Sequence, residues 1–589
     1  MLDSIRANLS AEAAANVEKW LTEPKFSEYK SEVEALIANE DWHTLEDSFF
    51  KVIEFGTGGR RGTTGVGSNR INRVTIGEST QALCLYAAKA DRDAPAKGVV
   101  IACDTRLSSP ELSKYAATVA AANGFKTYIF DSFRSTPELS FAVRRLGCSV
   151  GIVISASHNP PADNGFKAYW SDGGQLVAPH DKGVLAVASE INSIHALADF
   201  DTAVAEGQIT LIDKSMDTDY IQAVVDQSEG SARTLKIVYS PLHGAGQRNT
   251  LPVLQAAGFS DIITVKEQMI PDGNFPTVEN GKPNPEEKAA NDRAVAVMLA
   301  EDADIAITND PDADRIGVMV RQNDSAIYLN GNQSAVLATE YALRKQHEKG
   351  TLTPKHYIAK TIVTTDMMEA IANKYGVKTY GNMLVGFKYI GELILRKETS
   401  DEQFVIGGEE SYGLLKGTYA RDKDGAVGAL PLAEYAAELK LDNKTLWDRL
   451  LELYSEYGLY LERLDTLQCP GADGFKQMQA IMSSLRSKPP VEIDGHKVTA
   501  TLDYKTLQKR DLTTNEVSAI DCVSGDVLVY EFGDKRRRVS IRPSGTEPKM
   551  KFYVQWYDMA DNPTEYYHGL DQKLENLSRE LEGIALERA

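Results

Sequence analysis

The sequence predicts an α/β protein with three consecutive α/β domains, each with a mixed, mainly parallel sheet, followed by an α+β domain. From about residue 55 onward, short runs of β-branched and aliphatic residues alternate with alanine-rich helical stretches. The last part of the chain instead holds several strand-like runs and one long helical segment. The length of 589 residues is compatible with about four domains of roughly 150 residues each.

The N-terminal residues 1–48 are predicted to be helical, because apolar side chains recur near helical spacing among charged ones. These side chains are Trp20, Leu21, Tyr29, Val33 and Leu36. Residues 98–104 then predict a strand, and residues 110–124 predict a helix that ends at a glycine. Two more strands are expected at 126–132 and 150–156.

The alternation of strand-like and helical segments recurs twice before it gives way to consecutive strand-like segments. One unit covers about 235–265 and closes with strands near 304–320, and the next opens near 356–381. In the tail, we expect strands at 491–505, 525–532, 536–545 and 549–559, and a helix at 563–586. The predicted parts are an N-terminal helical extension (1–48), domain I (49–215), domain II (216–324), domain III (325–455) and domain IV (456–589).

Composition narrows the class of function. The formal net charge of −20 disfavours nucleic-acid binding, which needs a basic surface, but a local cluster of cations can still hold an anionic small molecule. The five cysteines include no Cys-x-x-Cys pair, so a reducing compartment is predicted. The N-terminus lacks the apolar core of a signal peptide, and no run of about 18 apolar residues follows. We therefore expect a cytoplasmic protein without a membrane partner.

Ligands of α/β folds bind beyond the carboxyl ends of the strands, and four predicted strands end in polar loops. The first loop, residues 152–161, contains Ser155, Ser157 and His158 before a Pro-Pro pair. A serine at such a place can carry a covalent group, or the hydroxyl groups can simply cap their own turn. The Gly-x-Ser-x-Gly elbow is absent, which disfavours a serine hydrolase.

A hairpin signal follows this serine loop. Asn164-Gly165 is typical of a tight turn between strands, and such a turn would bring Lys167 back toward the serine. There Lys167 could stabilise phosphate charge or shuttle a proton. A solvated lysine on a hairpin is the alternative interpretation.

The second loop, residues 307–315, places Asp310, Asp312 and Asp314 at alternate positions. Carboxylates this close repel one another unless a cation lies between them, and oxygen ligands suit Mg²⁺. An EF-hand is excluded, because Arg315 stands where that loop requires glycine. A solvated acidic turn is the alternative, but strands on both sides make it less expected.

The third and fourth loops offer ligands for a sugar and for a phosphate. Residues 405–413 combine glycines with Glu409, Glu410 and Ser411, which suits sugar hydroxyl groups, and a polar hairpin is the alternative. Residues 541–549 surround a glycine with cationic and hydroxyl side chains, which suits a phosphate. A tight Pro-Gly turn is the alternative there.

The order of these four loops resembles the α-D-phosphohexomutase family, and within it the phosphoglucomutase branch with its long phosphoglucomutase-2-like, phosphopentomutase-related members. The resemblance runs from about residue 55 to the C-terminal helix. Its most specific motifs are Ser-Ala-Ser-His-Asn-Pro at 155–160 and Asp-Pro-Asp-Ala-Asp-Arg at 310–315. Support comes from the Gly/Arg loop at 55–62, the turn at 542–548 and Arg-Asp-Lys-Asp-Gly at 421–425, which taken alone is most often a solvated loop.

The resemblance implies a role for each loop. Ser157 would be the phosphoserine, followed by His158, although Ser155 stands where many relatives have threonine and leaves a second candidate. Arg61 and Lys167 would serve the transferring phosphate and proton. Mg²⁺ would be held by Ser157, Asp310, Asp312 and Asp314. The substrate would be bound by Arg315, Lys388, Glu409, Ser411, Arg542, Ser544, Gly545, Thr546 and Lys549.

The resemblance also implies the activity. An isomerase of the phosphoglucomutase type would interconvert glucose 1-phosphate and glucose 6-phosphate, with glucose 1,6-bisphosphate as intermediate and activator. Closure of domain IV over a central cleft would keep water out. Mannose or pentose phosphates as substrates, a phosphatase, and a binding protein without catalysis remain alternatives, and the oligomeric state stays open.

Overall fold

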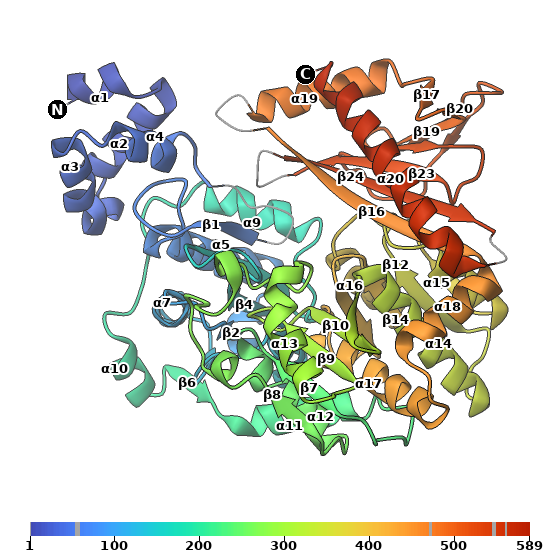
Figure 1. Ribbon diagram of the computed structural model, residues 1–589. Coiled ribbons are helices and arrows are strands. Elements are labelled where there is room, and N and C mark those ends of the chain that lie inside the picture. Colours follow the sequence, from blue (N-terminus) through green and yellow to red (C-terminus); the bar gives the residue numbers. More distant parts are fainter. Residues whose placement is uncertain (1, 54–58, 470–473, 545–548, 560–561, 589) are drawn as a thin grey trace.

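The computed structural model describes residues 2–53, 59–469, 474–544, 549–559 and 562–588. The chain begins with a group of short helices that lies beside the first sheet (Figure 1). These helices are α1 (Leu2–Asn8), α2 (Ala11–Thr22), α3 (Lys30–Ala38) and α4 (Trp42–Phe49). They enclose their own apolar cluster, which includes Trp20 and Phe49 and to which Val74 from the following helix contributes. The helical character predicted for this part of the chain is confirmed.

The first sheet has the order β1-β5-β4-β2-β3-β6. Its strands are β1 (Gly59–Thr63), β2 (Val99–Cys103), β3 (Thr127–Phe130), β4 (Val150–Ile154), β5 (Asp163–Trp170) and β6 (Ile209–Ile212). Strands β4, β2, β3 and β6 run parallel, and β5 is antiparallel to both of its neighbours. Helices α5 (Arg73–Ala90), α7 (Ser109–Ala122) and α8 (Thr136–Leu146) pack around this sheet. Strands β2 and β4 are buried along their whole length, as their continuous apolar sequences predict.

One local prediction is wrong. Asn164-Gly165 does not form a hairpin turn but lies inside β5, where the two residues pair with Gly62 and Arg61. The chain turns earlier, between β4 and β5, in the serine loop itself. A side chain at Gly165 would clash with the backbone, because an added Cβ would lie 2.6 Å from the Ser155 carbonyl oxygen. The glycine is therefore required by close strand packing rather than by a turn.

The second and third sheets repeat the mixed α/β pattern. The second has the order β11-β10-β9-β7-β8, and the third β13-β12-β14-β15. Their strands are β7 (Ile237–Ser240), β8 (Ile262–Thr264), β9 (Ile305–Asn309), β10 (Ile316–Gln322), β11 (Ser325–Leu329), β12 (His356–Lys360), β13 (Lys378–Tyr380), β14 (Gln403–Glu409) and β15 (Gly413–Lys416). The main helices are α12 (Thr250–Ala256), α13 (Lys288–Ala300), α14 (Gly331–Glu348), α15 (Met367–Lys374), α16 (Lys388–Lys397) and α17 (Gly425–Leu441).

The fourth sheet is antiparallel, in the order β16-β24-β23-β22-β19-β20-β21. The long helix α20 (Pro563–Leu586) packs on β16 and β24 (Figure 1). The strands of this sheet are β16 (Leu459–Gln468), β19 (Ala500–Asp503), β20 (Gln508–Asp511), β21 (Val517–Ala519), β22 (Leu528–Glu531), β23 (Arg538–Pro543) and β24 (Lys549–Asp558). Strand β16 was not expected from the sequence, because after Leu461 two of every three residues are charged or polar and leucine recurs only at every third position, which is not the period of a strand. The predicted fold class, three mixed α/β sheets and a C-terminal α+β part, is confirmed.

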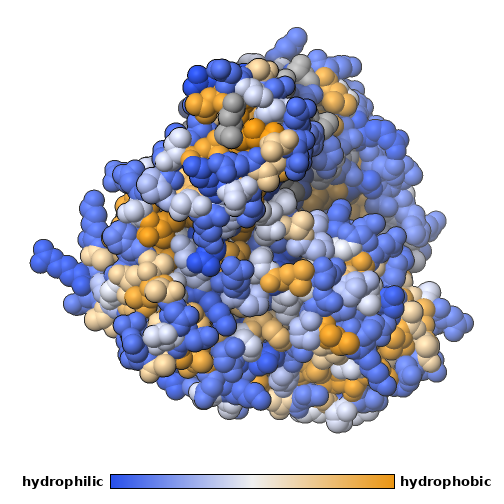
Figure 2. Space-filling model, turned by 90° about the vertical axis from the view of Figure 1, so that its left-hand side faces the viewer, coloured by the Kyte–Doolittle hydropathy of each residue, from blue (hydrophilic) through white to orange (hydrophobic). Residues whose placement is uncertain are grey.

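On the face of the molecule that Figure 2 shows, hydrophilic residues predominate and hydrophobic residues form separate patches, which is usual for a protein surface. Among the described helices, none is both long enough and apolar enough to cross a membrane.

Candidate active site

Ser157 lies in the loop that follows β4 at the carboxyl edge of the first sheet. Its backbone has φ 52°, a left-handed conformation that is uncommon for a residue other than glycine. The Ser157 Oγ donates a hydrogen bond of 2.6 Å to Oδ2 of Asp310, and it lies 3.3 Å from Nδ1 of His158. The serine loop of the first sheet therefore meets the acidic loop of the second sheet.

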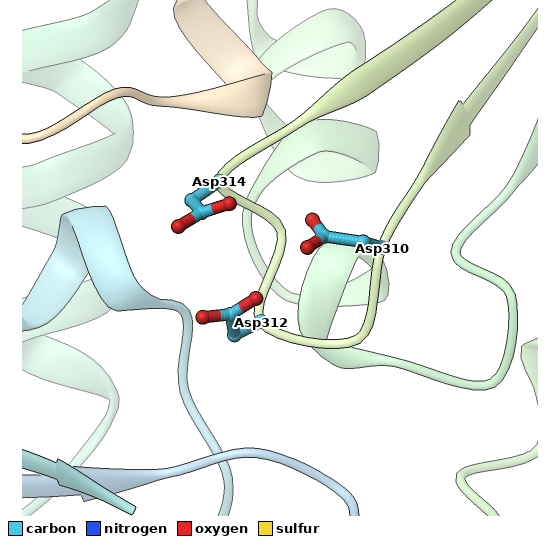
Figure 3. A group of neighbouring side chains, drawn as sticks. All are labelled: Asp310, Asp312 and Asp314. Carbon is cyan, nitrogen blue, oxygen red and sulfur yellow. The ribbon is translucent and has the colours of Figure 1, made fainter. Parts of the chain in front are cut away.

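The acidic loop connects β9 to β10. Asp310, Asp312 and Asp314 are all buried, and each offers one oxygen within 4.8 Å of the others. The three side chains converge from one turn of the chain (Figure 3). Ala313 between them has φ 55°, so this turn carries strain of the kind that occurs at functional sites.

Two lysines from other parts of the chain, one on β5 and one just before α17, partly balance these three carboxylates. The Nζ of Lys167, on β5, lies 2.5 Å from Oδ2 of Asp312, and the Nζ of Lys423 lies 2.7 Å from Oδ2 of Asp314. Asp312 Oδ1 and Asp314 Oδ1 are buried and find no hydrogen-bond partner among the described residues. Buried oxygens of this kind need a partner, so the arrangement fits a hard divalent cation between the carboxylates.

The protonation of the site follows from burial and charge. Burial, together with the neighbouring carboxylates of Asp312 and Asp314, raises the pKa of Asp310 well above its usual value. Burial opposes ionisation of Asp312 as well, but Lys167 outweighs it and holds the Asp312 pKa well below its usual value. A bound dication would favour the charged form of all three carboxyl groups.

His158 is held neutral. Burial lowers the pKa of its imidazole well below the usual value, and the positive charges of Arg315 and Arg61 lower it further. Arg61 lies on β1 and its Nη1 donates to Oδ1 of Asn159 at 3.3 Å. Arg315 forms an ion pair with Glu286, and its backbone N–H donates to Oδ1 of Asp310 at 3.1 Å. Both arginines thus flank the serine loop and the acidic loop.

The predicted sugar-binding residues lie on the third sheet. Glu409 is the last residue of β14 and accepts a hydrogen bond of 3.0 Å from the backbone N–H of Gly386. Burial raises the pKa of Glu409 to about 7. Lys388 begins α16, is buried, and has its Nζ 3.9 Å from Oδ2 of Asp181. Ser411 lies in the turn between β14 and β15.

The predicted phosphate turn joins β23 to β24 in the fourth sheet. Arg542 is on β23, and the backbone N–H of Ser544 donates to the carbonyl oxygen of Lys549 at 2.9 Å. Burial lowers the pKa of Lys388, and the charge of Arg542 contributes to the same shift, so Arg542 lies near Lys388, one of the residues predicted to bind the sugar. Gly545 and Thr546 lie outside the described residues.

Residues 421–425, for which a solvated loop was the alternative when the segment is taken alone, are not solvated. Arg421, Asp422 and Lys423 are buried, and Lys423 contacts the acidic loop as described. Asp424 begins α17 by accepting a hydrogen bond of 2.7 Å from the N–H of Ala426. The signal for this was a charge run placed directly before a glycine that starts an apolar helix, where a side-chain cap is typical.

Two other residues near the site were not predicted. The Oγ1 of Thr136, in the first turn of α8, donates a hydrogen bond of 2.6 Å to Oδ2 of Asp312. Arg106 follows β2, at the same sheet edge as the serine loop, and its Nη2 donates a hydrogen bond to the carbonyl oxygen of Ser157 in that loop. A polar residue just after a buried parallel strand was the available signal for Arg106.

Comparisons with known proteins agree with this geometry. Residues 52–195, 218–323 and 330–457 match the families described as phosphoglucomutase/phosphomannomutase alpha/beta/alpha domains I, II and III. A phosphoglucomutase of Staphylococcus aureus is 36% identical over 515 residues, which cover 86% of this chain and 90% of the relative. A phosphoglucomutase of Staphylococcus epidermidis is 34% identical over 520 residues, which cover 88% of this chain and 93% of that relative.

Solved structures share the fold. The open form of pp63/parafusin, a phosphoglucomutase from Paramecium, has a TM-score of 0.65 at 18% identity and covers 90% of this chain and 96% of its own. A putative phosphomannomutase from Thermus thermophilus has a TM-score of 0.62 at 22% identity, covering 91% of this chain and 99% of its own. The three matched domains and the relatives above 30% identity show that the chain belongs to the α-D-phosphohexomutase family of phosphotransferase and isomerase enzymes.

Proposed function

We propose that the protein is a phosphoglucomutase that interconverts glucose 1-phosphate and glucose 6-phosphate through a phosphoserine at Ser157. The observation that carries the proposal is the 2.6 Å contact between the Ser157 Oγ and Asp310, inside a group of three buried carboxylates. The full-length relatives named phosphoglucomutase favour glucose as the sugar.

Mg²⁺ fits the carboxylate group. Asp310, Asp312 and Asp314 would hold the ion together with one oxygen of a phosphate on Ser157, because hard oxygen ligands and a remaining open position suit this metal. When bound, the ion would neutralise charge on the phosphoryl group during transfer. In the resting enzyme it would also balance the charge of about −1.5 to −2 that a phosphoserine carries at pH 7.

The residues of the chain supply the rest of the reaction. In the first transfer the bond from phosphorus to the Ser157 Oγ breaks and a bond to the free hydroxyl oxygen of a sugar monophosphate forms. The hydroxyl proton ends on the Oγ, which leaves a free serine and a sugar bisphosphate. After the bisphosphate has reoriented, the Ser157 Oγ takes the other phosphoryl group, its proton passes to the sugar oxygen that is released, and the isomer leaves. Neutral His158, at 3.3 Å, can accept the serine proton, while Lys167 and Arg61 stabilise negative charge on the transferring group.

The sugar and its second phosphate are bound farther from the serine. Lys388, Glu409 and Ser411 would contact the sugar hydroxyl groups, and Arg315 would lie beside the transferring phosphate. The fourth sheet would hold the phosphate that does not react. The residues proposed for that phosphate are Arg542, Ser544, Gly545, Thr546 and Lys549.

An isomerisation assay over several sugar phosphates tests this proposal. Glucose 1-phosphate, mannose 1-phosphate and ribose 1-phosphate are compared, each with and without added glucose 1,6-bisphosphate. We expect the highest kcat/KM for glucose 1-phosphate and stimulation by the bisphosphate. A preference for mannose 1-phosphate or ribose 1-phosphate would change the proposed substrate. Release of inorganic phosphate without any isomer would show that the protein is a phosphatase and not a mutase.

Removal of the metal is expected to abolish turnover. Treatment with a chelator should inactivate the enzyme, and added Mg²⁺ should restore it. In Asp312→Asn we expect Mg²⁺ affinity, measured by calorimetry, to fall by about 10-fold or more, because one charged ligand of a buried group is lost. Full activity in the presence of the chelator would contradict the proposed requirement for Mg²⁺.

A further inference from the structure

Arg106 is a buried arginine whose contacts converge on the serine loop. It directly follows β2 and is 1% exposed. Its Nη2 donates to the carbonyl oxygens of Ser157 and Asn159 at 2.6 and 2.5 Å. Its Nη1 donates to those of Pro160 and Asp163 at 2.6 and 2.9 Å. One guanidinium group thus holds four carbonyl oxygens of the single segment 157–163.

Asp104 completes this arrangement from the same strand end. Its Oδ2 lies 3.2 Å from Nε of Arg106 and accepts a hydrogen bond of 2.7 Å from the Oγ of Ser155. The Ser155 Oγ in turn accepts the backbone N–H of Ser157 at 2.8 Å. The N–H and the C=O of Ser157 are therefore both held, through Ser155 and Arg106, by two buried charges that neutralise each other.

The segment between β8 and α13 also contacts Arg106. The ring of Phe275 lies 5.3 Å from the guanidinium carbon. Gly273 approaches so closely that an added Cβ would lie 2.7 Å from the Arg106 Cα. Arg106 thus lies between the serine loop and the part of the chain that carries the acidic loop.

We propose that Arg106 is a positioning residue for phosphoryl transfer, which holds the serine loop in the conformation that directs the Ser157 Oγ at the three carboxylates. This inference rests on the proposed function. The hydrogen bonds offset the strain of the left-handed backbone at Ser157. They also turn the partial negative charges of four carbonyl oxygens away from the side on which a phosphate on Ser157 would lie, where they would otherwise repel it.

Lysine cannot replace this arginine, because an ammonium group lacks the planar fork that reaches four acceptors at once. In Arg106→Lys we expect kcat for glucose 1-phosphate to fall by about 100-fold, as a misplaced reacting group would cause. KM should stay within about threefold, because the residues that bind the sugar and the distal phosphate are untouched. Mg²⁺ affinity, measured by calorimetry, should also be unchanged.

Arg449→Lys is the matched control. Arg449 donates to the Tyr435 hydroxyl on α17 at 2.7 Å and pairs with Glu340 on α14 at 3.0 Å, and both partners lie outside the serine loop. Both variants lose a partly or fully buried guanidinium group, so both should melt at a lower temperature, but only Arg106→Lys should lose kcat. If Arg106→Lys fails to fold, Asp104→Asn provides the second variant, with kcat expected to fall by about 10-fold at unchanged KM.

The outcomes separate this inference from the proposed function. A kcat of Arg106→Lys or Asp104→Asn equal to that of Arg449→Lys overturns the positioning role and leaves the mutase intact. A parallel loss of kcat, sugar affinity and metal affinity overturns it too, because that result indicates a general structural defect. A wild-type enzyme without mutase activity overturns the proposed function itself.

Discussion

Ser155 and Ser157 lie two positions apart in one loop, yet their hydroxyl groups make opposite contacts. The Ser157 Oγ faces Asp310 of the second sheet, whereas the Ser155 Oγ faces back to Asp104 of the first sheet. Both side chains are buried. The contacts therefore favour Ser157 as the phosphate carrier and Ser155 as a support for its backbone.

Exchange of each serine tests this distinction. In Ser157→Ala we expect the phosphoryl group to be absent from the purified chain and turnover to fall by about 1000-fold or more, because the nucleophile is lost. In Ser155→Ala the phosphoryl group should remain, with kcat reduced by about 10-fold. Intact-mass spectrometry and the isomerisation assay measure both. A phosphorylated Ser157→Ala chain would assign the carrier role to another residue.

Glu409 is expected to give the enzyme a pH dependence near neutrality. Burial raises its pKa to about 7, so the carboxyl group ionises as the pH rises through this value. If the charged form accepts hydrogen bonds from the sugar, kcat/KM should rise with pH in this range. The neutral variant Glu409→Gln should lack the rise at every pH. A rise of the same size in the variant would assign it to another group.

The raised pKa of Glu409 also makes the free energy of unfolding depend on pH, and this quantity falls where kcat/KM is expected to rise. Because the folded pKa is above the unfolded value of 4.5, the folded chain keeps a proton between these values that the unfolded chain has released. Stability from this group therefore decreases as pH rises from about 5 to about 7. Denaturant unfolding at the two pH values should show a smaller decrease for Glu409→Gln than for the wild type.

At the scale of elements, strand ends and helix starts bring the site together. The expected hairpin is absent, but the antiparallel pairing of β4 with β5 places Lys167 opposite Val153, and the Nζ of this lysine contacts Asp312 of the acidic loop. The start of α17 acts in a similar way. Asp424 caps this helix, and the preceding Lys423 is thereby held against the acidic loop.

Loss of this cap is predicted to destabilise the protein. The carboxylate of Asp424 accepts hydrogen bonds from the Ala426 N–H and from the Tyr220 and Tyr419 hydroxyl groups. Asp424→Ala leaves these donors buried and unpaired, so the free energy of unfolding should fall by about 2–4 kcal/mol. Asp199→Ala, which removes an exposed cap of α10 (Phe200–Ala205), should cost about 1 kcal/mol. Equal losses in denaturant unfolding would contradict the importance of burial.

At the scale of the whole molecule, a buried ion-pair cluster joins the third sheet to the fourth. Asp366, which precedes α15, pairs with Lys360 at the end of β12 and with Arg538 at the start of β23. Strand β23 also carries Arg542. The cluster therefore anchors the strand that holds the proposed phosphate-binding arginine.

Removal of Asp366 is expected to weaken this anchor. Asp366→Ala leaves the buried Lys360 and the half-buried Arg538 without their shared partner, so the free energy of unfolding should fall by about 3 kcal/mol. KM for glucose 1-phosphate should rise, since Arg542 is less firmly held. Glu575→Ala, which breaks an exposed pair with Arg579 on α20, should change stability by less than about 0.5 kcal/mol. Denaturant unfolding and initial rates test both variants. An unchanged KM in Asp366→Ala would show that the ion-pair cluster does not contribute to substrate binding.

Much of the fold and of the chemistry could be predicted because it is encoded locally. Buried strand β4 is a continuous apolar run and β9 begins with one, and the residues that follow each strand end are the ones that converge, including Ser157 and Asp310. The acidic loop could be predicted from its own residues alone, since three carboxylates on alternate residues of one turn repel one another unless a cation lies between them. Strand β16 was missed because leucine recurs at every third position in it (Leu461, Leu464, Leu467), whereas a half-buried strand is recognised by alternation of apolar and polar residues. Its pairing with β24 over ten residues was decided by tertiary structure.

The sequence by itself therefore determined the fold class, the order of the loops and the chemical nature of their side chains. The tertiary structure decided which of these groups meet. Lys423 is paired with Asp314 and Arg106 with the serine loop, although nothing in the local patterns names these partners. The physical reason is that a local pattern sets a residue's backbone conformation and polarity, whereas the partner of a buried charge depends on which distant segments the packed sheets bring within a few ångströms.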